Sequence, residues 1–216
     1  MPDPNNILIE EHKICFQMIC KAANTSMKWM LIDMFVPNNR KVEIAKAPYK
    51  FWPVCHKDDI PDDYLVIGFC RHPEDRIISC WKDKVNGKRF HQGFNRRHPG
   101  KFHHHMPFNE FVKQVATIPD AEGFLCDQHF RSQTYDLKLN RVDELVRMES
   151  IRKDWDRARD MIFNHAKVAY PEIYHRNKTS KKETFEVSPE TRKLIEQRYA
   201  DDYKLLNYES RNSSNP

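Results

Sequence analysis

Two segments of the sequence combine a cation with small and hydroxyl-bearing residues directly after an apolar run. The first is Lys21-Ala22-Ala23-Asn24-Thr25-Ser26, and the second is Arg71-His72-Pro73-Glu74-Asp75-Arg76-Ile77-Ile78-Ser79. A turn that leads into a helix presents backbone N–H groups and the positive end of the helix dipole to an anion, and a Lys or Arg adds charge. The two segments therefore predict two phosphate-type sites, which suits a ligand with phosphates at both ends.

Two apolar strands and the helices after them would position these cations. Residues 13–20 and 64–70 are β-rich apolar runs, residues 26–35 have apolar side chains at helical spacing, and Pro73 opens a second helix with acidic residues in its first turn. Alternating strands and helices predict a single α/β domain with a central, mainly parallel sheet flanked by helices on both faces. Such sheets bind ligands beyond the carboxyl ends of their strands.

The rest of the chain divides by composition. Residues 1–12 form a short N-terminal extension, residues 13–208 the folded domain and residues 209–216 a tail that we expect to be disordered. Residues 84–105 are rich in Lys, Arg, His, Gly and Pro without an apolar period, which predicts a long basic surface loop. The remaining elements are expected to be a strand over residues 49–56, a helix over 108–115, a strand over 141–148, and helices over 149–166 and from Ser188.

Composition narrows the function classes. The chain has 216 residues, 39% hydrophobic and 12% aromatic, which is typical of a globular domain rather than a disordered chain. Its formal charge of +5 suits an anionic ligand but is too small to argue for nucleic acid. Neither a signal peptide nor an apolar run of about 20 residues is present, so we expect a cytoplasmic protein without a membrane anchor. The six cysteines are expected to be mostly buried thiols, and no Cys-x-x-Cys pair predicts zinc.

The two segments resemble motifs of the carbohydrate sulfotransferases that use 3′-phosphoadenosine-5′-phosphosulfate (PAPS). The resemblance implies a P-loop-NTPase-like fold in which Lys21 binds the 5′-phosphosulfate, while Arg71 and Ser79 hold the 3′-phosphate. Cys20 stands where the family usually has Pro. Golgi members carry an anchor and stem, so this chain is similar to a soluble form, which favours a microbial or viral source.

The resemblance continues through the second half of the chain, in the family's order. Four segments carry it: Asp127-Gln128-His129-Phe130-Arg131-Ser132-Gln133, Glu149-Ser150-Ile151-Arg152-Lys153-Asp154-Trp155, His175-Arg176-Asn177-Lys178-Thr179-Ser180-Lys181, and the terminal run from Tyr199 to Tyr208. By resemblance, Lys178 and Thr179 would lie over the nucleotide. The acceptor would be a hydroxyl group, most simply on a saccharide.

Sulfuryl transfer needs a cation at the bridging oxygen and a base for the acceptor proton. Lys21 is the expected cation. His129 is the preferred base because of its place in the family-like segment, and His56, after a predicted strand, is the rival. No acidic pair is placed to hold Mg²⁺, so we expect PAPS and its product adenosine 3′,5′-bisphosphate (PAP) to bind without metal. His103, His104 and His105 are expected to lie in a solvated loop.

Two other functions are compatible with strand-turn-helix anion sites. A nucleotide kinase or phosphotransferase also binds phosphate at a turn between a strand and a helix. Against this function, the first loop contains no glycine and lacks the Walker pattern. A non-catalytic protein that binds polyanions is the second alternative. Against it, the basic residues are not interleaved with aromatics as a stacking platform.

Overall fold

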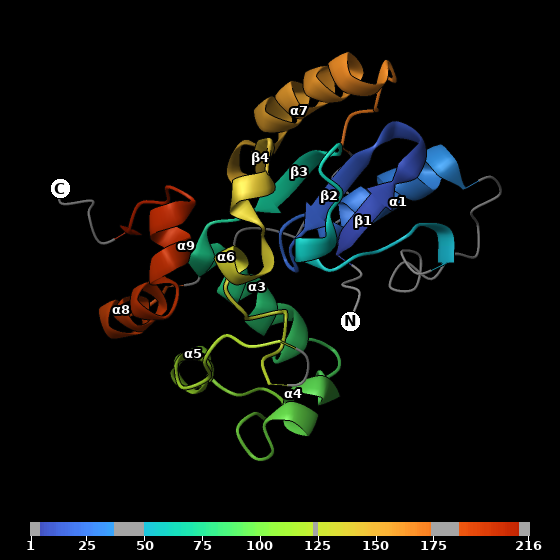
Figure 1. Ribbon diagram of the computed structural model, residues 1–216. Coiled ribbons are helices and arrows are strands. Elements are labelled where there is room, and N and C mark those ends of the chain that lie inside the picture. The colour runs from blue at the N-terminus through green and yellow to red at the C-terminus, as the bar shows by residue number, and fades with distance from the viewer. Residues whose placement is uncertain (1–4, 37–49, 123–124, 174–185, 212–216) are drawn as a thin grey trace. The chain divides into compact units, whose positions relative to one another are not determined.

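The computed structural model describes residues 5–36, 50–122, 125–173 and 186–211 (Figure 1). Its contacts separate the chain into two compact units, each made of two stretches of sequence. Residues 1–70 with 136–180 form the sheet unit, and residues 71–135 with 181–216 form the helical unit. Lys178 and Thr179, predicted to bind the nucleotide, lie outside the described residues.

The sheet unit contains a four-stranded sheet with the order β1-β2-β3-β4. Its strands are β1 (Asn6–Ile9), β2 (Ile14–Met18), β3 (Leu65–Cys70) and β4 (Glu144–Arg147). Strand β1 pairs antiparallel with β2, whereas β2, β3 and β4 are parallel to one another. The predicted α/β class with a mainly parallel sheet is confirmed. Because Met18 pairs with Phe69, β2 and β3 also end at the same edge of the sheet.

Helices α1 (Asn24–Phe35) and α7 (Ile151–Ala166) flank this sheet and share one core cluster with it. That cluster includes Phe16 and Phe69 of the sheet, Leu31 of α1 and Trp155 of α7. On the opposite face, Cys15 and Val66 of the sheet pack against Ile60, Tyr64 and Val142. These three residues lie in irregular segments that follow the 3-10 helices η2 (Lys57–Asp59) and η3 (Leu139–Arg141). Strand β3 is buried on both faces, which explains its continuous apolar sequence.

Residues 6–9 are part of the sheet, so the prediction of an N-terminal extension over residues 1–12 is wrong for its described part. Residues 6–9 form β1 and residues 10–12 the 3-10 helix η1 (Glu10–His12). Ile7 and Ile9 are buried in the core. The strand is too short for its apolar residues to form a recognisable pattern in the sequence. The strand expected over residues 49–56 is reduced, among the described residues, to a bridge between Ile7 and Val54.

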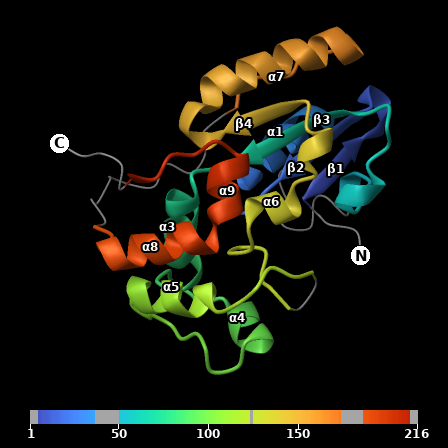
Figure 2. The same cartoon turned by 60° about the vertical axis from the view of Figure 1, so that its left-hand side comes forward.

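The helical unit consists of short helices (Figure 2). Their buried side chains form a core rich in aromatic residues. The helices are α3 (Pro73–Lys84), α4 (Gln92–Arg97), α5 (Phe108–Ala116), α8 (Pro189–Arg198) and α9 (Ala200–Leu205). Two short elements remain: α6 (Gln133–Asp136), at the boundary between the two stretches of sequence, and the 3-10 helix η4 (Met148–Ser150) of the sheet unit. Pro73 occupies the first turn of α3, and Ser188 caps α8 by accepting a hydrogen bond from the Thr191 N–H. Within the described residues, no helix is both long and apolar enough to span a bilayer.

Two predictions fail in this unit. The segment 84–105 is not simply a surface loop, because it contains α4 and buries Phe94 and Phe102 in the core, at 0% and 2% exposure. The prediction failed because these two phenylalanines are isolated among basic residues and form no helical apolar pattern. The start of the predicted disordered tail is ordered as well: Arg211 forms ion pairs with Glu74 and Asp75. Residues 212–216 lie outside the described residues.

Candidate active site

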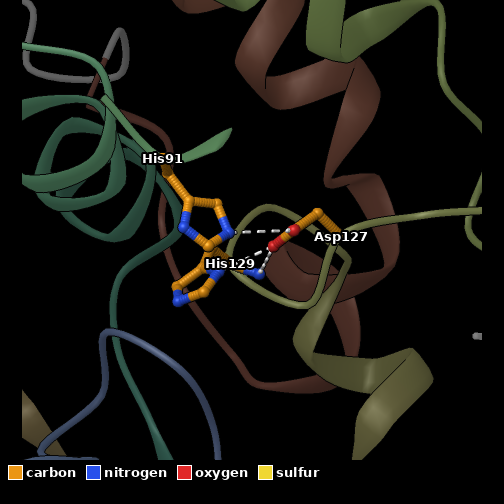
Figure 3. A group of neighbouring side chains, drawn as sticks. All are labelled: His91, Asp127 and His129. Carbon is orange, nitrogen blue, oxygen red and sulfur yellow. Dashed lines mark hydrogen bonds and ion pairs between the residues drawn. The ribbon is translucent and has the colours of Figure 1, made fainter. Parts of the chain in front are cut away.

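A histidine and a buried aspartate form the most chemically distinctive group of the helical unit. His129 Nδ1 lies 2.6 Å from Asp127 Oδ1, and the His129 backbone N–H donates to the same oxygen at 3.0 Å (Figure 3). The Asp127 side chain is only 2% exposed, and that of His129 is 15% exposed. With Nδ1–H donated to Asp127, Nε2 carries the lone pair of the ring, so this arrangement can accept a proton at Nε2.

The electrostatics of this pair favour a neutral imidazole beside an ionised carboxylate. Burial alone would raise the pKa of Asp127, but hydrogen bonds from His129 and His91 outweigh it and hold that pKa far below its usual range. For His129, burial is the largest influence and lowers its pKa below 6.5, although the bond to Asp127 acts in the opposite direction. His129 is therefore ready to accept a proton at neutral pH.

Two further groups share the Asp127 carboxylate. His91 Nε2 lies 3.5 Å and Arg97 Nη1 2.9 Å from Asp127 Oδ2. The His91 ring also packs edge-on against His129, with ring centroids 5.0 Å apart. A Cβ atom at Gly93 would come within 2.6 Å of His91 Nε2 and 2.8 Å of Arg97 Nη1, so glycine leaves the space that both side chains need.

The triad of His91, Asp127 and His129 also brings its ligand atoms within 4.8 Å of one another, as a metal site would. The guanidinium of Arg97 already occupies Asp127 Oδ2 and places a positive charge there. A cation would have to approach against that charge. The local charge therefore favours an imidazole held by a carboxylate over a metal centre.

Arg71, predicted to bind the 3′-phosphate, is held through its backbone by a buried amide. The Arg71 N–H donates to Gln133 Oε1 at 2.9 Å, and Gln133 Nε2 donates to the Arg71 carbonyl at 2.8 Å. Gln133 is fully buried, and its own N–H donates to Asp202 Oδ2 at 3.0 Å. Asp202, also fully buried, accepts from the Thr134 N–H and hydroxyl. A buried polar network thus fixes the start of the second predicted anion segment.

The other residues of this segment are half-buried or buried. Ser79 lies half-buried on α3. Arg76 is 1% exposed and donates to the Gln128 carbonyl at 3.1 Å, which is a structural contact. His72 precedes α3, and its Nε2 lies 3.1 Å from the Glu209 carbonyl. The structure therefore brings Arg71 next to the motif that contains Gln133, although the sequence analysis assigned no function to this glutamine.

In the sheet unit, the turn around Lys21 has a different construction. Lys21 and Ala23 have positive φ angles of 71° and 57°, which are costly for residues with a Cβ. Helix α1 starts at Asn24 with Ala23 as its N-cap, and no side chain caps it. Asn24, a member of the first predicted anion segment, donates from its side-chain amide to Asn5 Oδ1 at 2.6 Å. Thr25 and Ser26 lie in the first turn of α1, beside backbone N–H groups that have no intrahelical acceptor.

His56, the rival base, has weaker support. Its Nδ1 accepts from the Asp58 N–H at 3.4 Å, and Asp58 Oδ2 lies 3.4 Å away. Asp58 is 49% exposed and also pairs with Lys138. A solvated carboxylate shared with a lysine orients an imidazole less firmly than the buried Asp127 does. His103, His104 and His105 are exposed, as expected.

Comparison with protein families gives one match of nearly full length. The model of the sulfotransferase family matches residues 5–209. The chain belongs to the sulfotransferase family. No curated protein and no solved structure gave a significant match. The family match supports sulfuryl transfer as the general chemistry of this chain.

In this sulfotransferase, one short segment organises much of the helical unit. Between Asp127 and Gln133, the chain supplies the carboxylate for His129, the carbonyl of Gln128 for Arg76 and the amide that holds Arg71. The Tyr199 hydroxyl donates to the Phe130 carbonyl at 2.6 Å and fastens this segment to the C-terminal helices. This segment is recognisable in the sequence, but the roles of Gln133 within it and of its contacts Asp202, His91 and Arg97 were not predicted. The resemblance at residues 127–133 and 199–208 was the available signal for the first two.

Proposed function

We propose that this sulfotransferase moves the sulfuryl group of PAPS to a hydroxyl group of a carbohydrate, with His129 as the general base. The observation that carries the proposal is the buried Asp127–His129 pair, with Nδ1 and Oδ1 2.6 Å apart. A carboxylate that holds one ring nitrogen as a donor leaves the other as a proton acceptor. This is the group that hydroxyl-directed transfer needs.

The donor is assigned to two turns that differ in structure. The Lys21 turn offers uncapped backbone N–H groups at the start of α1 and two left-handed residues, a backbone shape suited to an anion such as a 5′-phosphosulfate. Arg71 follows β3 directly, and Gln133 fixes its backbone. The side chain assigned to the 3′-phosphate therefore extends from a rigid attachment point. Ser79 adds a hydroxyl donor. Lys178 and Thr179 are assigned to the nucleotide on the family resemblance alone.

The chemical step follows from these assignments. The acceptor oxygen attacks the sulfur of PAPS, and its O–H bond breaks as the proton passes to His129 Nε2. The bond between the sulfur and the bridging oxygen breaks, and PAP leaves with the electron pair. Lys21 stabilises the negative charge that develops on the bridging oxygen. Asp127 keeps the His129 ring oriented and stabilises the imidazolium once it has formed.

The experiment measures transfer from PAPS to a panel of saccharides by wild type, His129→Ala and His56→Ala, together with PAP affinity. His129→Ala should lower transfer by about 10²–10⁴-fold, the usual contribution of a positioned base, and leave PAP affinity nearly unchanged. His56→Ala should retain activity. If His56→Ala abolishes transfer while His129→Ala only lowers the melting temperature, His129 is a structural residue and the assignment of the base is wrong.

A further inference from the structure

The end of the described chain lies against the start of α3 in the helical unit. Arg211 donates from Nη1 and Nη2 to the two carboxylate oxygens of Asp75, at 2.9 and 2.8 Å. Its Nη1 also donates to Glu74 Oε1 at 3.1 Å. Both acids lie in the first turn of α3, close behind Arg71 in the sequence. The C-terminal segment, residues 208–211, therefore contacts the second predicted anion segment.

Several contacts fix the path of this C-terminal segment. The Tyr208 N–H donates to the Tyr203 carbonyl at 2.9 Å, and His72 Nε2 lies 3.1 Å from the Glu209 carbonyl. The His72 ring also meets the rings of Tyr203 and Tyr208 edge-on, with centroids 5.5 and 5.3 Å away. These contacts hold the chain beside the start of α3, where Arg211 reaches the two acids.

The carboxylates of Glu74 and Asp75 oppose anion binding at this point. They suit the positive end of the α3 dipole, but their charge repels a phosphate and competes with it for Arg71. Burial would raise the pKa of Asp75, but the bonds and charge of Arg211, followed by the charges of Arg71 and His72, hold that pKa below its usual range. Asp75 thus lies within electrostatic reach of Arg71 as well as of Arg211.

Two arginines neutralise these acids. Arg192 of α8, the helix beside α3 in Figure 2, lies with its Nε 2.8 Å from Glu74 Oε2, and Arg211 bonds to Glu74 and to both oxygens of Asp75. Without Arg211, Glu74 would keep its contact with Arg192, whereas both Asp75 oxygens would lose the bonds described above. The charge of Asp75 would then act on Arg71 and on any anion bound there.

We infer that Arg211 is a positioning residue of the donor site, which keeps the Asp75 carboxylate from competing with the 3′-phosphate of PAPS for Arg71. The inference rests on the proposed function, because it takes Arg71 as the ligand of that phosphate. It gives the C-terminal segment a role in donor binding that requires no contact between Arg211 and the donor.

The test is calorimetry of the full chain with PAP. Arg211→Ala should weaken PAP binding by about three- to tenfold, less than Arg71→Ala, because Arg211 acts through Asp75 and its side chain is 41% exposed. Asp75→Asn/Arg211→Ala should restore the wild-type affinity, since it removes the competing charge together with its partner. A double variant that binds PAP as weakly as Arg211→Ala would overturn the inference, because the loss would then not depend on Asp75.

Two further measurements distinguish this role from a purely structural one. The loss of PAP affinity in Arg211→Ala should shrink at high salt, because salt screens interactions between partly exposed charges. The Michaelis constant for PAPS should rise by about the same factor, while the turnover number stays near that of wild type. A loss of affinity that is independent of salt and accompanied by a fall in turnover would show a damaged fold and overturn the inference.

Two single variants complete the experiment. Arg96→Ala is the matched control, because it removes an exposed arginine of α4 in the same unit. Equal losses of PAP affinity in Arg96→Ala and Arg211→Ala would show a general charge effect and overturn the inference. Unchanged PAP affinity in Arg71→Ala would contradict the donor assignment and the inference with it. A loss in Arg71→Ala with none in Arg211→Ala would overturn the inference alone.

Discussion

The two predicted anion segments look alike in sequence but are built in different ways. The turn after β2 depends on its backbone, with two left-handed residues and an uncapped helix start. The segment after β3 depends on buried side chains, since Gln133 and Asp202 fix the backbone of Arg71. The same buried construction recurs at Asp127 and His129. Two turns with similar motifs can therefore be expected to respond to mutation in different ways.

The largest effect among these variants is expected at the backbone-built turn. Lys21→Ala should lower the turnover number by about 10²–10³-fold, because it removes a charge that is most useful as the bridging oxygen becomes negative. Single-turnover transfer from PAPS measures this loss. A change confined to the Michaelis constant would show that Lys21 binds the donor without acting in the transition state.

Arg71→Ala should weaken binding rather than chemistry. A charge-assisted contact with phosphate contributes about 1.5–3 kcal/mol, so PAP affinity should fall by roughly ten- to a hundredfold. Calorimetry on wild type and variant gives the difference directly. Arg96→Ala is the matched control, since Arg96 is an exposed arginine of α4. If both variants lose the same affinity, Arg71 contributes only general charge.

Gln133→Met tests whether the buried network holds Arg71. The substitution keeps much of the volume but leaves the Arg71 backbone groups and Asp202 without the amide, which should cost about 1–3 kcal/mol of unfolding free energy. PAP affinity should fall by a smaller factor than in Arg71→Ala. Chemical denaturation and calorimetry together measure both effects, with Gln114→Met on α5 as the control. If Gln133→Met is destabilised but binds PAP with unchanged affinity, the buried network stabilises the fold without contributing to PAP binding.

The pH dependence of transfer tests the buried pair. Burial lowers the pKa of His129 in the folded protein, so the neutral base should persist below pH 6.5. The acid limb of kcat/KM for the acceptor should therefore lie below 6.5. The same shift implies that stability falls as the pH drops below 6.5, because the unfolded chain takes up a proton that the folded chain resists. An acid limb above 6.5 would contradict the neutral, buried imidazole.

The smallest effect is expected from relief of backbone strain at Ala23. A left-handed alanine costs roughly 1–2 kcal/mol, whereas glycine adds about 0.4–1 kcal/mol of unfolded-chain entropy. Ala23→Gly should therefore raise the unfolding free energy slightly, by about 1 kcal/mol or less. Ala22→Gly, at a fully buried position without a positive φ, should lower it. Equal destabilisation by both would show that the turn is not held by its backbone.

Sequence reasoning succeeded where the signal was local and periodic. The apolar run of β3, the proline that opens α3 and the cap of α8 are properties of a few neighbouring residues. It failed where the partner is distant in the chain. Gln133 meets Arg71 across 62 residues and Asp202 across 69. Phe94 was hidden within a basic segment because a single buried aromatic on a short helix creates no period.

The most direct test of the donor assignment is calorimetry of the wild-type protein with PAP and with ATP, each with and without EDTA. We expect PAP to bind more tightly than ATP and EDTA to leave the PAP affinity unchanged, because Lys21 and Arg71 supply the charge. Tighter binding of ATP with a strict requirement for Mg²⁺ would contradict this donor assignment and favour phosphoryl transfer.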